Sequence, residues 1–513
     1  MKRTLILAAL TGLLATAMPL EAGAQVLQTP PRDQWYAEND SGHWSDGTRV
    51  RIDEACLALP ESEQVSCSLE EFKKKPFTVI AFVDSGINPY HKDFRAPDFV
   101  HHPSEFIQGY PAVAEALPLS FGLADSEGYA AARTADDEEV LSAIQRNRLY
   151  WFPGTRIIGG YSTTAGTRST PAPVWPDRNI IDENSHGTGV ASVAAGQFYG
   201  SNPNALIVMV EGLGDASLNW ATSQSWIDIV SNSWGNVGGV PIGSTTASRN
   251  AVRRGQTVAF AAGNGASNTN SYGACNGNAN MCVKPWTNDG GPVPVEDPCK
   301  CKTPDSNPSF TSPYGGPSWL LTVGATSPIN GQAHWWHSMP VDVSSFGSKW
   351  RAASVDGVEF TSNRDFGGTS CATPITSGVL SAVIDRAREV FEDSVGGQRP
   401  GQVVAAASPG VTLPASGPLS DGTLTRSEAE AIVMKSTVHV PFDPDKTTWD
   451  YAIRPTTGTA YDFAVQGYGV VDRDSKARAL KVLMGELPMP NRADVDEAIA
   501  RFDTLRNAVW GNP

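Results

Sequence analysis

A serine follows a glycine pair and precedes a long apolar run in the segment Gly367-Gly368-Thr369-Ser370-Cys371-Ala372-Thr373-Pro374. A serine hydroxyl is a weak nucleophile unless a base accepts its proton and a third group orients that base. The chain has a candidate for each task. Asp84 follows the strand-like run 77–83, and His186 opens the helix-like run 186–195. Together, Ser370, His186 and Asp84 would suffice for nucleophilic attack on a carbonyl carbon.

Taken singly, each of these residues has a more ordinary explanation. Asp84 could be a turn residue, His186 a helix cap or surface group, and Ser370 a helix cap. Asn264, between two glycines, could be a turn former, although its amide could also donate a hydrogen bond to an oxyanion. The catalytic interpretation therefore depends on the four residues occurring together.

Buried strands must position these residues. Unbroken β-branched and aromatic runs, typical of strands covered on both faces, lie at 77–83, 206–210, 226–230, 257–262 and 320–323. Helical patterns separate several of them, which predicts an α/β domain with a parallel sheet. Sites in such sheets form at the carboxyl ends of strands. Asp84 and Asn264 both follow such a run.

Composition narrows the class of protein. The 513 residues are 40% hydrophobic and 18% charged, which predicts a packed globular core. The formal net charge is −15, which argues against a general binder of nucleic acid or anionic membranes. The ordinary explanation of this acidity is solubility.

The N-terminus resembles a secretory signal, predicted to span residues 1–24. Lys2 and Arg3 precede the mostly apolar stretch 5–20, and Ala22-Gly23-Ala24 provides small residues for cleavage. A membrane anchor is the alternative, but the apolar stretch is short for spanning a bilayer. Residues 25–75 are polar and irregular, and could be a short pro-segment or an N-terminal extension.

The main domain is predicted at 76–487, with a C-terminal helix or tail at 488–513. Three stretches within the domain have the composition of insertions, at about 95–150, 266–317 and 396–422. We expect a surface helix around 136–150, a loop at 396–422, and a helix at 425–435 that opens with a capping pattern.

Seven cysteines fit an exported protein. Six of them could form three disulfides of unknown connectivity: Cys56, Cys67, Cys275, Cys282, Cys299 and Cys301. A metal site is the alternative for the last four, but their spacing is not a usual zinc pattern. Cys371 remains, and we expect it to be a buried, inert thiol.

Four segments, in order, resemble the motifs of the subtilisin-like (S8) serine peptidases. They are Val83-Asp84-Ser85-Gly86-Ile87, Asn184-Ser185-His186-Gly187-Thr188-Gly189-Val190-Ala191, Ala261-Ala262-Gly263-Asn264-Gly265 and Gly368-Thr369-Ser370-Cys371-Ala372-Thr373-Pro374. The resemblance implies a three-layer, doubly wound, mostly parallel sheet flanked by helices. It also implies that Asp84 orients His186, that His186 activates Ser370, and that Asn264 stabilises the oxyanion.

The resemblance further implies a secreted serine endopeptidase that hydrolyses peptide bonds through an acyl-enzyme on Ser370. Four residues would line the substrate-binding cleft: Ser233, Trp234, Gly235 and Gly263. The partner would be a protein or peptide substrate, with no nucleic acid and, after signal cleavage, no membrane; the oligomeric state is left open. Catalysis would require no cofactor or metal, and structural calcium, which many family members bind, has no assignable ligands here.

Two other functions are compatible with the same residues. An acyl transferase or peptide ligase would pass the acyl group to an amine instead of water. A non-catalytic, peptide-binding protein could retain the scaffold. Three positions depart from the family pattern: Ser185 replaces a glycine, Gly189 replaces a second histidine, and Cys371 replaces a methionine or alanine.

Overall fold

The computed structural model describes residues 56, 58–120, 129–164, 180–235, 242–264, 317–327, 332–333, 341–347, 350–355, 357–358, 366–393, 403–437 and 466–511. The predicted signal segment and the four clustered cysteines between 275 and 301 lie outside these residues. Within the described ranges, no helix is long and apolar enough to cross a membrane.

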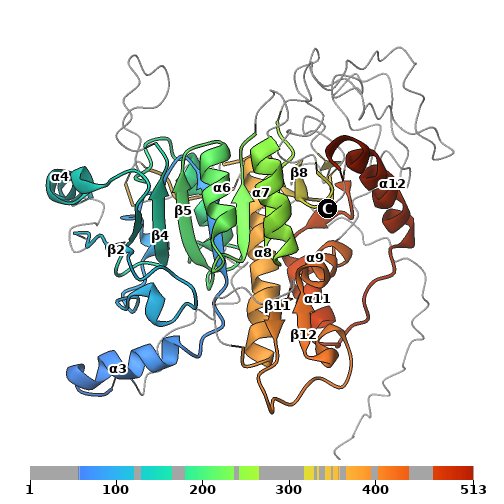
Figure 1. Cartoon of the computed structure of the whole chain (residues 1–513), viewed down its shortest axis with the longest axis horizontal. Coiled ribbons are helices and arrows are strands. Elements are labelled where there is room, and N and C mark those ends of the chain that lie inside the picture. The colour runs from blue at the N-terminus through green and yellow to red at the C-terminus, as the bar shows by residue number, and fades with distance from the viewer. Residues whose placement is uncertain are drawn as a thin grey trace, which may run out of the picture.

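A large, mostly parallel sheet forms the centre of the molecule (Figure 1). Its strands follow the order β13-β10-β8-β7-β6-β1-β5-β4-β3-β2, and β9 pairs with β8 outside this path. The strands are β1 (Val79–Asp84), β2 (Glu115–Ala116), β3 (Leu149–Trp151), β4 (Ile157–Ser162), β5 (Leu206–Glu211), β6 (Ile229–Asn232), β7 (Thr257–Ala261), β8 (Leu321–Ser327), β9 (Gln332–Ala333), β10 (Val343–Phe346) and β13 (Val470–Val471). The pairs β3–β4 and β8–β9 are antiparallel.

Helices cover both faces of the sheet. α5 (His186–Ala195) and α8 (Thr369–Val390) pack on one face, while α6 (Asp215–Ser223) and α7 (Ile242–Arg253) pack on the other. Successive side chains of β1 point to opposite faces of the sheet, so this strand contributes to the core on each face. Ile80 and Phe82 join the core that contains α5 and α8, whereas Val79, Ala81 and Val83 join the core that contains α6 and α7. The predicted three-layer α/β fold is confirmed.

Smaller elements surround these layers. Near the N-terminus are α3 (Glu61–Phe72), η1 (Lys92–Phe94), η2 (Pro103–Glu105), α4 (Tyr129–Glu139) and η4 (Leu141–Ala143). Beyond α8 are β11 (Val403–Ala406), η8 (Pro418–Asp421), β12 (Thr423–Thr425), α9 (Arg426–Lys435), α11 (Arg473–Leu483) and α12 (Ala493–Trp510). β11 and β12 form a separate antiparallel pair.

Some sequence-based expectations differ from this arrangement. The helix expected at 136–150 is wrong beyond Glu139, because Leu149–Trp151 is a strand that pairs with β4. The stretch 396–422 is not wholly a loop, since it contains β11 and η8. The capping pattern is confirmed: Thr425 and Glu428 form a capping box at the start of α9.

The segment before β1 is helical rather than irregular. α3 carries Phe72, which is buried against the rings of Phe77, Phe99 and Phe106 at centroid distances of 5.7, 4.7 and 5.2 Å. Because these rings belong to the core beside α6 and α7, α3 completes a part of the main domain. Whether residues 25–75 include a removable pro-segment stays a prediction.

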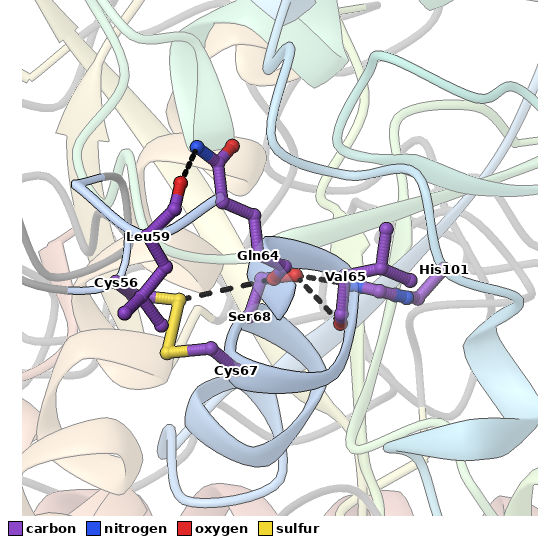
Figure 2. The surroundings of a disulfide bond; sticks show 7 residues. All are labelled: Cys56, Leu59, Gln64, Val65, Cys67, Ser68 and His101. Atoms are coloured by element: carbon purple, nitrogen blue, oxygen red, sulfur yellow. Dashed lines mark hydrogen bonds between the residues drawn. A yellow bond between two sulfur atoms is a disulfide. The ribbon is translucent and has the colours of Figure 1, made fainter. Parts of the chain in front are cut away.

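A disulfide and a hydrogen bond fasten α3 (Figure 2). Cys56 is bonded to Cys67, which settles one pairing that the sequence left open. At the residue after Cys67, the hydroxyl of Ser68 and Nε2 of His101 are 2.7 Å apart and buried. These two links join the helix to the chain before it and to the loop after η1.

Asp385 is a buried carboxyl group on α8, the helix that packs on one face of the sheet. Asp385 accepts a hydrogen bond from Nδ2 of Asn202 at 2.7 Å and contacts the hydroxyl of Thr78. Burial raises the pKa of Asp385 to about 7, and the hydrogen bonds only partly offset this effect. When protonated, Asp385 can donate to the Thr78 oxygen, because the Thr78 hydroxyl can donate to the carbonyl of Ser381 at 3.2 Å.

Replacing Asp385 with asparagine should therefore remove a pH-dependent loss of stability. Between about pH 4 and 7 the folded carboxyl stays protonated while the unfolded one ionises, so folding becomes less favourable as pH rises. Asparagine mimics the protonated acid at every pH. The free energy of unfolding of Asp385→Asn relative to the native protein should rise by roughly 2–4 kcal/mol from pH 4 to pH 8. Urea unfolding at pH 4, 6 and 8 measures this. The prediction would be wrong if the free energies of unfolding of the two proteins changed equally between pH 4 and pH 8.

Candidate active site

The sheet order brings Asp84 to the point where its winding reverses. β1 lies between β5 and β6, and Asp84 is its last residue. His186 is the first residue of α5, and its Nδ1 lies 2.7 Å from Oδ1 of Asp84. Ligands of doubly wound sheets bind in the crevice at such a reversal. The structure thus unites two of the predicted site residues at the expected edge.

The contact between His186 and Asp84 depends on a close approach of the backbone at Gly86 to the backbone at Gly187. A Cβ atom on Gly187 would lie 2.1 Å from the carbonyl oxygen of Gly86, so only glycine fits at the start of α5. The Ser85 hydroxyl accepts a hydrogen bond from the Gly187 N–H at 2.9 Å and donates to Asp182 at 3.0 Å. These bonds hold the residue after Asp84 against the residue after His186.

Asp182, three residues before the N-cap Ser185, binds the first turn of α5 and was missed by sequence reasoning. Its buried carboxylate accepts hydrogen bonds from the backbone N–H and the hydroxyl of Thr188, at 2.9 and 2.6 Å, and from the Asn184 N–H at 2.8 Å. An acidic residue shortly before a predicted helix start is the signal that could have indicated it. Asp182 therefore fixes the helix end that carries His186.

The surroundings of His186 act on its pKa in opposite directions. Burial of the ring lowers the pKa, but the charge of Asp84, its hydrogen bond and the charge of Asp182 together raise it above the ordinary value. The proton on Nδ1 is held by Asp84, so the neutral ring presents the lone pair of Nε2. That tautomer is the one a general base requires.

Ser370 is the second residue of α8, at the end of the helix that faces this edge. Its hydroxyl donates a hydrogen bond to the carbonyl oxygen of Ser233 at 3.1 Å. Among the described residues, no hydrogen bond joins Ser370 to His186. The N-terminal position leaves the Ser370 N–H among the first helical amides, which have no acceptor within the helix.

Asn264 lies beside the same helix end. Its Oδ1 accepts hydrogen bonds from the N–H and hydroxyl of Thr369 at 2.9 and 2.8 Å, which leaves its Nδ2 as the donor end. A Cβ on Gly368, at φ +77°, would lie 2.8 Å from this Nδ2. The Gly263 N–H donates to the Thr369 hydroxyl at 3.2 Å. Asn264 and Gly263 are thus tied to the residue before Ser370.

The remaining predicted binding residues follow β6. Ser233 is buried and contacts Ser370, as described above. Trp234 is 9% exposed and packs its ring against Phe260 at a centroid distance of 5.7 Å. Gly235 is exposed. This segment therefore runs from the nucleophile outward to the surface.

Three departures from the family pattern have local explanations. Ser185 has φ +72°, a conformation that favours glycine, and its hydroxyl accepts a hydrogen bond from the Val355 N–H at 3.2 Å. A Cβ on Gly189 would lie 2.6 Å from the ring of Phe366, which occupies the space a larger residue would need. Cys371 is a free, fully buried thiol whose pKa is raised by burial, as expected for an inert cysteine.

Phe366 is a second site residue that sequence reasoning missed. Its ring centroid lies 5.9 Å from that of His186. The two rings are tilted at 60° to each other, so Phe366 packs beside the imidazole. No local sequence pattern marks this packing, because the contact joins segments far apart in the chain.

Comparison with known proteins identifies the family of the chain. The family model described as the subtilase family (Peptidase_S8) matches residues 77–395, more than half of the chain. One similar solved structure is an epidermin leader peptide processing serine protease from Staphylococcus aureus, with 14% sequence identity and a TM-score of 0.38, covering 79% of this chain and 75% of that one. No curated protein matches the sequence. On the strength of the family model, the chain belongs to the subtilase family of serine peptidases.

Proposed function

We propose that this protein is a secreted serine endopeptidase that uses Asp84, His186 and Ser370 as its catalytic triad. The observation that carries the proposal is the 2.7 Å contact between Asp84 and His186 at the sheet edge that also holds Ser370. Family membership supports the same reaction class. The signal-like N-terminus supports secretion.

The first chemical step would form an acyl-enzyme. Nε2 of His186 accepts the proton of the Ser370 hydroxyl as Oγ attacks the carbonyl carbon of the peptide bond. The negative oxygen that develops would accept hydrogen bonds from Nδ2 of Asn264 and the N–H of Ser370. His186 then donates the proton to the leaving amine, and the peptide bond breaks.

The second step would reverse these roles with water. His186 accepts a proton from water, whose oxygen attacks the acyl carbon, and then returns the proton to Ser370 Oγ. Asp84 stabilises the imidazolium in both steps. The mechanism requires no cofactor. A protein or peptide is the substrate class, and hydrolysis at internal bonds is the proposed specificity.

Labelling with a fluorophosphonate tests the nucleophile directly. The probe should bond to Oγ of Ser370, displacing fluoride, and peptide mapping should place the label on this residue alone. Prior heat denaturation should abolish labelling. A folded native protein that takes up no label would overturn the proposal. Incubation with a peptide library would then show whether cleavage occurs at internal bonds.

A further inference from the structure

The nucleophile's own carbonyl group lacks its normal partner in α8. In a regular helix the carbonyl of Ser370 would accept a hydrogen bond from the N–H of residue 374. Pro374 lies inside the helix and has no N–H. A buried carbonyl without a donor is unfavourable, so another group must supply one.

Ser233 supplies that donor. Its hydroxyl donates to the carbonyl oxygen of Ser370 at 3.0 Å. The exchange is reciprocal, because the Ser370 hydroxyl donates to the carbonyl oxygen of Ser233 at 3.1 Å. The two residues are 6% and 8% exposed. A pair of buried hydrogen bonds thus joins the residue after β6 to the backbone and side chain of the nucleophile.

We infer that Ser233 is a positioning residue whose side chain fixes the backbone of Ser370 for attack. The inference rests on the proposed function and adds a role for this side chain, distinct from its predicted place in the substrate cleft. The helix cannot hold the Ser370 carbonyl at its start because of Pro374. Without the Ser233 hydroxyl, the peptide plane that follows Ser370 is free to tilt, and Oγ would spend less time aligned with Nε2 of His186.

Replacing Ser233 with alanine should lower kcat about tenfold, the size expected for one buried hydrogen bond. The Ser233 backbone carbonyl remains, so KM should change less than twofold. The rate of fluorophosphonate labelling, which needs no peptide binding, should fall by the same factor as kcat. A thermal scan would confirm that Ser233→Ala is folded at the assay temperature.

Ser377→Ala is the matched control. Its hydroxyl is buried between the same helix and strand, donating to the Ser231 hydroxyl at 3.1 Å, but it lies two turns beyond the nucleophile. This variant should match the native kcat within twofold. A loss as large as that of Ser233→Ala would show that any buried serine between the two elements matters equally, and would overturn the inference.

Pro374→Ala provides a rescue. Alanine restores an N–H four residues after Ser370, which can donate to the same carbonyl. In this background Ser233→Ala should lower kcat less than threefold instead of about tenfold. Full additivity of the two substitutions would overturn the inference. If the native protein is active while Ser233→Ala retains native kcat, only the inference fails; if the native protein neither labels nor cleaves, the proposed function itself fails.

Discussion

Ser370→Ala should lower kcat by about 10⁶, the size known for loss of the nucleophile in subtilisin itself. Removing Oγ leaves no atom that can form the acyl-enzyme, while the oxyanion donors stay in place. The small methyl group fits the buried position, so the fold and substrate affinity should be kept. Progress curves on a cleavable peptide measure kcat, and equilibrium binding of that peptide to the variant measures affinity.

Ser377→Ala again serves as the control, since it removes a hydroxyl from the same helix away from the site. Contamination by native enzyme sets the lowest measurable rate, so residual activity should be checked for insensitivity to the fluorophosphonate. A Ser370→Ala protein that retains more than about 1% of native kcat would rule out Ser370 as nucleophile, because no other group could replace it at that level.

Asp84→Asn should lower kcat by about 10⁴, the loss known when an amide replaces the triad aspartate in a serine peptidase. The amide donates to Nδ1 of His186 where the carboxylate accepted, so the proton moves to Nε2 and the ring cannot act as a base. Steady-state kinetics measures the loss. Asp474→Asn, the same change at an exposed position on α11, should have no effect.

The same variant should also shift the pH profile. In the native protein, activity should fall on the acid side as His186 becomes protonated, at a pH above the ordinary histidine value, because Asp84 and Asp182 raise its pKa against the effect of burial. Asp84→Asn removes the charge and leaves burial, so this acid limb should move to lower pH. A profile of kcat/KM between pH 4 and 9 reports it. An unmoved limb would mean that His186 is not the titrating base.

Much of the fold could be predicted because the central strands are continuous apolar runs. β1, β5 and β7 begin and end within two residues of the predicted runs. β4 was missed because Gly159 and Gly160 interrupt its pattern. A Cβ on Gly159 would lie 2.9 Å from the Val208 side chain, so strand packing dictates these glycines. Such a requirement arises from a neighbour almost 50 residues away and leaves no periodic pattern.

The candidate site, like the fold, could be predicted only in part from the sequence. The motifs locate Asp84, His186, Asn264 and Ser370 because each lies at the end of a recognisable element. The order of the residues along the chain does not reveal the hydrogen bonds between Ser233 and Ser370, nor the approach of Phe366 to His186. Those contacts depend on which strands become neighbours, and sheet order is set by the whole core rather than by local sequence.

The family match at 77–395 is smaller than the unit that must fold. Phe72, before its first residue, completes the aromatic cluster beneath α3. Beyond its last residue, Leu419, Ile432 and Val482 are fully buried in the core around α8, and Val470 pairs with β10. The two ends of the family match therefore lie within the packed core and not in linkers. A shortened chain limited to residues 77–395 should therefore lose part of its core and fold poorly.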